Sequence, residues 1–257
     1  MNETAAIRIL GHRGGAGGMY PENSIPAFQH GIQLGANGVE LDVRLSRDNR
    51  VMVIHDPMID RVSLGSGRVA ELGAAELRRH ALVDASGTPH PDTRIPVLEE
   101  LLETIGAVAI NIDLKTEDIG LARAVADIIR RYDAVHRTTV ASFIPAAMQF
   151  FRSIAPDIST SADPQEVRAL VRARYVRETV KTTARRVQIP SRYRFFPLAT
   201  KGFVAYLHRH NMAVDVWTVN NPRVALKLAR NGVDGLVTDD VATIRQALIS
   251  GGAHNDA

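Results

Sequence analysis

The stretch Gly38-Val39-Glu40-Leu41-Asp42-Val43-Arg44-Leu45-Ser46-Arg47-Asp48-Asn49-Arg50-Val51-Met52-Val53-Ile54-His55-Asp56 decides the fold. Its two apolar runs, 39–45 and 51–54, are separated only by the polar segment 46–50. A parallel pair of strands would need a crossover of about a dozen residues, so the runs must form an antiparallel hairpin. This hairpin pairs Leu45 with Val51 and brings His55 back beside Asp42.

The first strand of this hairpin carries two carboxylates on one face. Glu40 and Asp42 lie two positions apart, and side chains at that spacing in a strand point the same way. They could form the wet face of an ordinary amphipathic strand, but the apolar neighbours Val39 and Leu41 favour a buried position. Because buried carboxylates need a partner, a hard cation with oxygen ligands is a suitable one.

Composition limits the class of protein. The 257 residues are 45% hydrophobic, which suits one barrel-sized domain with a real core. The net charge of +3 is compatible with an anionic substrate and far from a nucleic-acid-binding signature. No cysteine is present, so disulfides and thiol chemistry are excluded. Neither a leader peptide nor a membrane-spanning run is apparent, so a cytoplasmic location without a transmembrane segment is expected. The oligomeric state is left open.

Short strands alternate with amphipathic helices along the chain. The predicted strands lie at Ile9, Leu41, Ile112, Val140, Ser159, Gln188, Val216 and Val237, and each is followed by a helix. This alternation predicts an α/β fold, a single (β/α)8 TIM barrel, with an open doubly wound sheet as the alternative. Residues 56–95 carry turn signals and few apolar runs, which predicts a small insertion after the second strand within one domain, 1–257. A basic helix is expected from Pro164 to about Thr183.

Polar residues lie where these strands end. The sequence places there His12, Arg13, Glu40, Asp42, Asp113, Lys115, Ser142, Gln188, Trp217, Asn220 and Asp239. Active sites of (β/α)8 barrels lie at the carboxyl ends of the strands, and packing requires none of these residues. The pattern therefore predicts an active site.

The motifs resemble the glycerophosphodiester phosphodiesterase family. They are Gly11-His12-Arg13-Gly14, Pro21-Glu22-Asn23-Ser24, Gly38-Val39-Glu40-Leu41-Asp42-Val43, His55-Asp56-Pro57, Val216-Trp217-Thr218-Val219-Asn220 and Gly232-Val233-Asp234-Gly235-Leu236-Val237-Thr238-Asp239. The resemblance implies a (β/α)8 barrel with a segment inserted after the second strand. It also implies metal-dependent hydrolysis of glycerophosphodiesters to glycerol 3-phosphate and an alcohol, with one divalent cation, Mg²⁺ or Ca²⁺.

The resemblance also implies residue roles. His12 and His55 would be the acid/base pair, and Arg13 would hold the phosphate. Glu40 and Asp42 would bind the metal.

The third metal ligand departs from the family pattern. The family usually has a glutamate in a Glu-Leu-Lys segment, whereas this chain has Asp113-Leu114-Lys115. Asp113 would still be the ligand, one methylene shorter. Lys115 would contact substrate, and Trp217 would pack against the glycerol or alcohol carbons.

Structural roles compete with several of these assignments. Asp113 and Lys115 could be a structural ion pair, and Trp217 could belong to the core. Glu22 and Asn23 are expected to fix their loop, and Asp239 to cap the last helix. The basic stretch 168–186 is expected to be a solvated helix face that steers anions, rather than a site for lipid or nucleic acid.

The alternative function is a lysophospholipase D or sphingomyelinase D-like activity on lipid phosphodiesters. It would require exposed apolar residues in 56–95, where the sequence has few. A non-catalytic barrel that binds a phosphorylated ligand is a further alternative. The sequence leaves open which alcohol is released, which histidine is the acid, and whether water or the glycerol 2-hydroxyl attacks.

Overall fold

Eight parallel strands form the centre of the molecule in this computed structural model, which describes residues 7–176, 180–193 and 195–252. Neighbouring strands follow the order β8-β7-β6-β2-β1-β13-β12-β9. Their bounds are β1 Arg8–His12, β2 Gly38–Leu45, β6 Ala109–Leu114, β7 Thr138–Ala141, β8 Ser159–Thr160, β9 Arg186–Pro190, β12 Ala213–Trp217 and β13 Gly235–Thr238. A parallel bridge between Ser161 and Arg186 joins the two ends of this order. The predicted (β/α)8 barrel is therefore confirmed.

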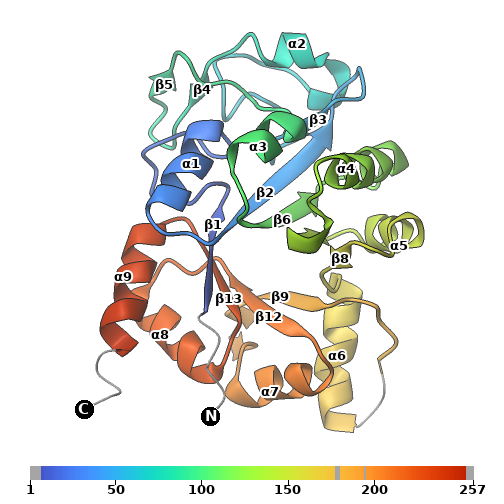
Figure 1. Ribbon diagram of the computed structural model, residues 1–257, viewed down its shortest axis with the longest axis vertical. Coiled ribbons are helices and arrows are strands. Elements are labelled where there is room, and N and C mark those ends of the chain that lie inside the picture. The colour runs from blue at the N-terminus through green and yellow to red at the C-terminus, as the bar shows by residue number, and fades with distance from the viewer. Residues whose placement is uncertain (1–6, 177–179, 194, 253–257) are drawn as a thin grey trace.

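Helices surround these strands in chain order (Figure 1). They are α1 Ile25–Gln33, α3 Leu98–Thr104, α4 Ile119–Arg131, α5 Pro145–Ile154, α6 Pro164–Val176, α7 Lys201–Arg209, α8 Pro222–Asn231 and α9 Val241–Gly252, with a short 3₁₀ turn, η2 Val135–Arg137. Local signals start several of them: Ser24 caps α1 by accepting from the Ala27 N–H. The expected extension of α6 to about Thr183 is wrong, because 180–184 has no helical structure; residues 177–179 lie outside the described part.

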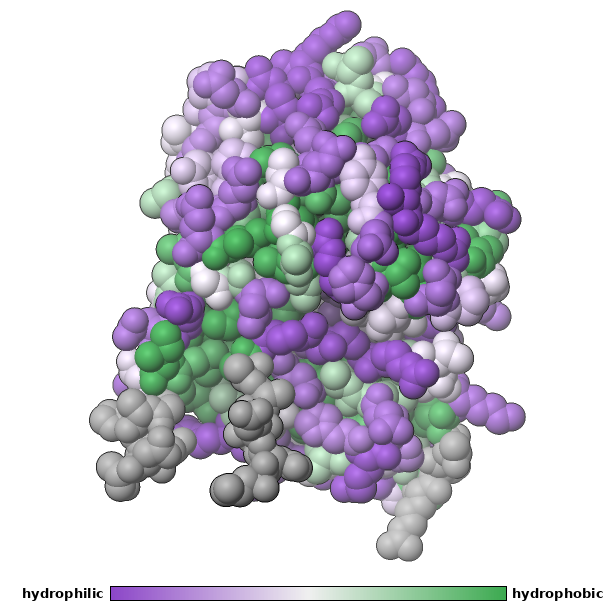
Figure 2. All heavy atoms as spheres, viewed as in Figure 1, coloured by the Kyte–Doolittle hydropathy of each residue, from purple (hydrophilic) through white to green (hydrophobic). Residues whose placement is uncertain are grey.

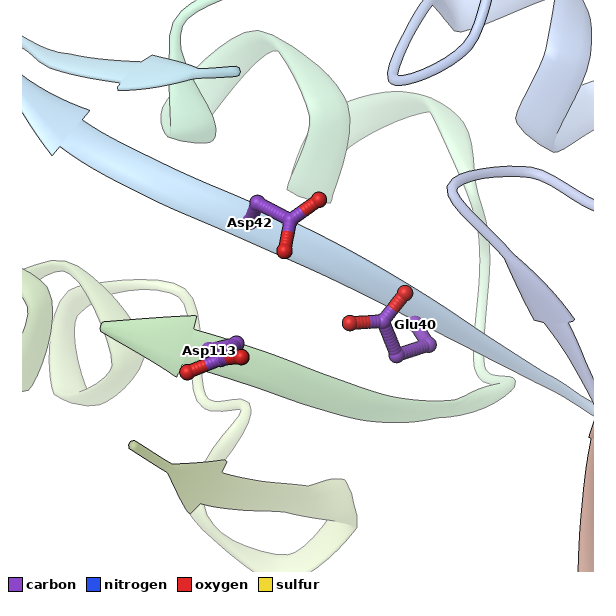
Figure 3. Close-up of side chains that lie close together, drawn as sticks. All are labelled: Glu40, Asp42 and Asp113. Carbon is purple, nitrogen blue, oxygen red and sulfur yellow. The ribbon is translucent and has the colours of Figure 1, made fainter. Parts of the chain in front are cut away.

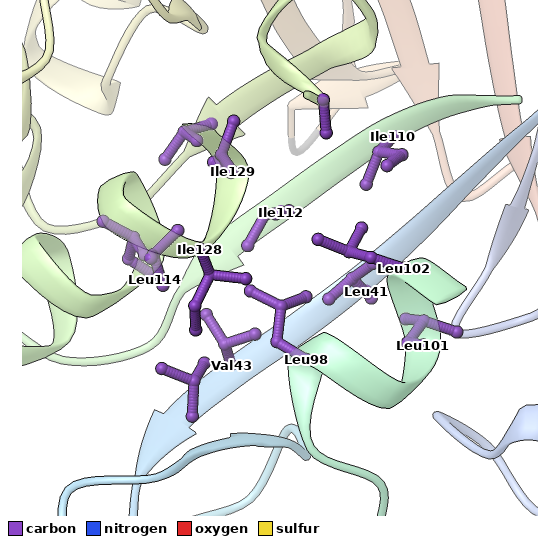
Figure 4. Packing of buried hydrophobic residues seen from close by; sticks show 14 of the residues in the cluster. Leu41, Val43, Leu98, Leu101, Leu102, Ile110, Ile112, Leu114, Ile128 and Ile129 are labelled. Atoms are coloured by element: carbon purple, nitrogen blue, oxygen red, sulfur yellow. The ribbon is translucent and has the colours of Figure 1, made fainter. Parts of the chain in front are cut away.

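The strand pattern separates an apolar shell from a polar interior. Leu41 and Val43 of β2 are fully buried and pack with Leu98 of α3 and Ile128 of α4 (Figure 4). Glu40 and Asp42 alternate with them, so they face the inside of the barrel. Burial of the apolar face fixes the register, because a slip of one residue would turn the carboxylates into the helix layer.

The central hairpin forms as predicted. Strand β3, Val51–Val53, runs antiparallel to β2, and Leu45 pairs with Val51. The Ile54 N–H donates to the Asp42 carbonyl at 2.9 Å, which places His55 at the carboxyl end of the barrel.

The segment 56–95 follows β3 and projects beyond α1 and α3 (Figure 1). It contains η1 Val69–Glu71, α2 Ala74–Leu77, β4 Leu82–Val83 and β5 Pro89–His90. Its buried residues, among them Ile59, Leu77 and Leu82, form an apolar cluster with Met52 and Ile54 of the central hairpin. That cluster holds the inserted segment against the barrel.

A charged network fills the barrel below the acidic cluster. Asp215 of β12 is fully buried and accepts from Arg186 at 2.7 and 2.8 Å and from Arg8 at 3.1 Å. Gln188 donates to Asn111 at 2.8 Å inside this network. Gln188 is therefore an interior residue in the middle of β9, and its expected place at the barrel mouth is wrong.

Candidate active site

Three carboxylates meet inside the barrel near the carboxyl ends of β2 and β6 (Figure 3). Glu40, Asp42 and Asp113 each offer an oxygen within 4.8 Å of the others. Asp42 and Asp113 are partners in the β2–β6 register, so the barrel itself aligns them. One buried oxygen of Asp113, Oδ1, has no hydrogen-bond partner within the described residues. All three are hard oxygen donors and suit a divalent cation such as Mg²⁺ or Ca²⁺.

Two cationic side chains balance part of this negative charge. The Lys115 ammonium contacts Asp42 at 2.8 Å and Asp113 at 2.7 Å. The Arg13 guanidinium lies 3.2 Å from Asp42, and the Arg13 backbone N–H donates to Glu40 at 3.2 Å. The Asp113–Lys115 ion pair considered from the sequence therefore exists, and it lies inside the predicted site.

The carboxylates titrate differently because their neighbours differ. Burial, together with the charge of Asp42, raises the pKa of Glu40 to about 8. Burial likewise raises the pKa of Asp113 to about 6 against the opposing charge of Lys115. Burial would also raise the pKa of Asp42, but Lys115 and Arg13 outweigh it and lower that pKa. Additional positive charge in this cluster would stabilise the ionised carboxylates.

His12, at the end of β1, is held by an aspartate. Its Nδ1 lies 2.6 Å from Oδ1 of Asp239, and its Nε2 lies 3.9 Å from Glu40. Asn220 in turn donates to Asp239 at 2.6 Å. The expectation that Asp239 caps the last helix is wrong, because the adjacent Asp240 accepts from the Thr243 N–H instead.

His55 has a matching partner in the next residue. Its Nδ1 lies 2.6 Å from Asp56, and its carbonyl accepts from Arg44 at 2.8 Å. In both histidines a carboxylate occupies Nδ1, which leaves Nε2 available to a ligand. The sequence identified both histidines as candidates, but it did not predict that His55 pairs with Asp56, its neighbour in the His55-Asp56-Pro57 motif.

Arg61 of the inserted segment links the two sides of the site, and sequence reasoning missed it. It donates to Asp56 at 2.5 Å and to both oxygens of Glu22, at 2.9 and 2.7 Å. Glu22 also accepts from Arg13 at 2.9 Å. Glu22 therefore fixes its loop, as expected, and no local sequence signal indicated that an arginine 39 residues away would join it.

An aromatic pair stands at the ends of β7 and β12. The Trp217 ring is partly exposed and meets Phe143 edge to face, with 5.5 Å between centroids. The alternative that Trp217 belongs to the core is therefore wrong. Phe143 is 57% exposed, and the Lys115 ammonium lies 5.8 Å from its ring centroid. These rings offer apolar contact surface next to the cluster of charges.

Asn23 and Ser142 hold the surrounding structure. Asn23 donates to Asp42 at 2.9 Å, and Ser142 donates to the Leu114 carbonyl at 2.6 Å. Both residues are buried. Asn23 therefore orients a carboxylate as well as its own loop.

The comparisons with known proteins agree with this architecture. Residues 12–243 match the model of the glycerophosphoryl diester phosphodiesterase family, and the chain belongs to that family. A glycerophosphodiester phosphodiesterase of Bacillus altitudinis is 31% identical over 90% of this chain and 94% of its own length. One from Caldanaerobacter subterraneus is 28% identical over 95% of this chain and 98% of its own. The structure of the Thermotoga maritima glycerophosphodiester phosphodiesterase aligns with a TM-score of 0.71 and 26% identity, covering 93% of this chain and 97% of that one.

The family defines the class of reaction. The protein is a phosphoric diester hydrolase of the glycerophosphoryl diester phosphodiesterase family. Among the described residues, none of the helices has the length and apolar character needed to cross a membrane.

Proposed function

We propose that the protein hydrolyses glycerophosphodiesters to glycerol 3-phosphate and an alcohol, with His12 and His55 as its acid/base pair. The observation that carries the proposal is the placement of both histidines, each paired with an aspartate, beside one buried carboxylate cluster. Residues 1–257 would form a single domain whose inserted segment, 56–95, contributes to the same site.

Glu40, Asp42 and Asp113 are the residues that would hold one divalent cation, Mg²⁺ or Ca²⁺. The unpartnered Oδ1 of Asp113 and the raised pKa of Glu40 fit a site that takes up positive charge. A cation bound there would neutralise charge on the phosphate oxygens and so favour attack on phosphorus. Asp113 supports this role although it is one methylene shorter than the family's usual glutamate.

Arg13 and Lys115 would hold the phosphate of the substrate. Each lies against the carboxylate cluster, and a phosphodiester placed there would contact both positive charges. A guanidinium binds two phosphate oxygens at once, whereas an ammonium acts as a point charge. Trp217, beside Phe143, would pack against the glycerol or alcohol carbons.

The histidines would move the protons. One takes the proton of the nucleophile, water or the glycerol 2-hydroxyl, and the other gives a proton to the leaving alcohol oxygen. Asp239 and Asp56 hold the two imidazoles through Nδ1, so that Nε2 is the atom that exchanges the proton. A carboxylate at Nδ1 also stabilises the protonated ring during transfer.

The inserted segment favours a small substrate over the lipid phosphodiesters of the alternative function. Among its described residues, Leu64 is the exposed large hydrophobic side chain, at 63%. The face in Figure 2 is accordingly mostly hydrophilic toward the end where this segment lies.

The test is release of glycerol 3-phosphate from glycerophosphocholine by purified protein, with Mg²⁺, with Ca²⁺ and with a chelator. Metal-dependent release that both His12→Ala and His55→Ala abolish would support the proposal. Absence of release with either metal, or full activity of either variant, would contradict it.

A further inference from the structure

A short hairpin at the barrel mouth exposes three aromatic side chains. After β9 the chain forms β10, Arg192–Tyr193, paired antiparallel with β11, Phe196–Pro197. Tyr193 is 60% exposed, Phe195 88% and Phe196 73%. Large aromatic rings this exposed and this close together are unusual on a soluble surface and indicate a binding surface.

The hairpin lies at the same end of the barrel as the candidate site. Pro190, the last residue of β9, pairs in register with Trp217 of β12, and the hairpin follows directly. The chain then enters α7 at Lys201, so this segment is a strand-to-helix loop on the carboxyl face. The three aromatic residues, called the aromatic patch below, therefore flank the mouth on the Trp217 side.

The segment of chain that carries the aromatic patch has a positive net charge. The sequence contains no aspartate or glutamate from residue 179 to residue 214. Arg192 precedes the patch along the chain and Lys201 follows it, and both side chains are exposed. Aromatic rings that penetrate the headgroup layer, flanked by basic residues that meet lipid phosphates, are the features of an interfacial membrane-binding surface.

A second copy of the chain is a poor occupant of this patch. In a twofold dimer the same patch would meet itself, which would bring the Arg192 side chains of the two copies together. Three residues are also far fewer than the roughly 20–30 that each partner contributes to a stable interface.

We propose that the aromatic patch seats the barrel mouth on an anionic lipid surface. Tyr193, Phe195 and Phe196 enter the headgroup region, and Arg192 and Lys201 contact lipid phosphates. Seated in this way, the barrel mouth lies at the lipid surface. The proposal rests on the proposed function only for the identity of the reaction; binding to the lipid surface is independent of it.

The experiment is co-sedimentation with vesicles of phosphatidylcholine alone or mixed with phosphatidylglycerol, using the full chain. The double variant Phe195→Ser, Phe196→Ser removes two rings of the patch. Tyr175→Ser is the matched control, because Tyr175 is 74% exposed but lies near the carboxyl end of α6, on the opposite face of the barrel. Hydrolysis of soluble glycerophosphocholine is measured for all three proteins, and their oligomeric state is determined by size-exclusion chromatography.

We expect wild-type protein to bind the anionic vesicles, more weakly as salt increases, and the double variant to bind about tenfold or more weakly. Tyr175→Ser should bind as wild type, and hydrolysis of glycerophosphocholine should be equal in all three. No binding by wild type, equal binding by the double variant, or a wild-type dimer that the double variant dissociates would overturn the proposal. If wild type binds vesicles but does not hydrolyse glycerophosphocholine, the proposed function fails and the lipid-binding surface stands.

Discussion

Arg61→Gln tests whether the inserted segment orients the residues proposed to be catalytic. In the wild type the Arg61 guanidinium donates to Asp56 at 2.5 Å and to Glu22 at 2.9 and 2.7 Å. Through these two carboxylates it restrains both His55 and Arg13. Glutamine keeps a polar side chain but loses the charge and the fork of donors, so both carboxylates become free to turn.

The structure sets the magnitude of the expected change. The Arg61 side chain is 51% exposed, so its ion pairs contribute about 1 kcal/mol or less to stability. Partners one step removed from the reacting groups typically contribute about tenfold to a hundredfold to activity. That loss corresponds to about 1.4–2.8 kcal/mol in the barrier to reaction. We therefore expect a marked fall in kcat with a small change in the free energy of unfolding.

The assay is hydrolysis of glycerophosphocholine together with urea unfolding. Arg61→Lys should recover part of the activity, because one ammonium can contact one carboxylate but cannot bridge both. Arg68→Gln is the matched control in the same segment, since its pairing with Glu71 at 3.8 Å is exposed. Activity of Arg61→Gln within about twofold of wild type, or an equal loss in Arg68→Gln, would refute the reasoning.

Three further predictions concern the two histidines, the carboxylate cluster and the buried charge network. Burial lowers the pKa of His55 below its usual value, although the hydrogen bond to Asp56 opposes this. Burial also acts to lower the pKa of His12, but the hydrogen bond to Asp239 and the charge of Glu40 outweigh it and raise that pKa above its usual value. These opposite shifts favour His55 as the base, which works when neutral, and His12 as the acid, which works when protonated. We therefore expect kcat/KM to rise through the first pKa and fall through the second, and a profile without the alkaline fall would contradict this. Asp113→Asn should weaken Ca²⁺ binding measured by calorimetry, and unchanged affinity would exclude Asp113 as a ligand. Asp215→Ala should lower the free energy of unfolding by about 3–5 kcal/mol, because it leaves the buried charge of Arg186 without its partner. An exposed ion pair contributes about 1 kcal/mol or less, so a loss below about 1 kcal/mol would refute this prediction.

Much of the fold was predictable because it depends on periodicity. All eight strands lie where the apolar runs predict them, and the Leu45–Val51 pairing follows from the length of the turn. The convergence of Glu40, Asp42 and Asp113 was predictable for a related reason. Strand geometry puts alternate residues on one face, and a barrel brings the carboxyl ends of its strands together.

What the sequence could not show depends on long-range contacts between side chains. Asp239 lies beside Asp240 at the start of α9, and either could have capped it; only the folded barrel brings Asp239 to His12, 227 positions away. Arg61 was missed because its partner Glu22 belongs to another loop, 39 residues away. The basic helix was predicted to be too long, since its charge pattern continues after the helix has ended.

The central claim is that the carboxylate cluster and the histidine pair together release glycerol 3-phosphate. We would follow glycerophosphocholine by ³¹P NMR in the presence of Mg²⁺ or Ca²⁺, add chelator during the reaction, and then restore the metal. We predict that a glycerol 3-phosphate resonance grows, stops on chelation and resumes on restoration. Formation of phosphocholine in its place, no conversion of substrate, or a rate unaffected by the chelator would contradict the account.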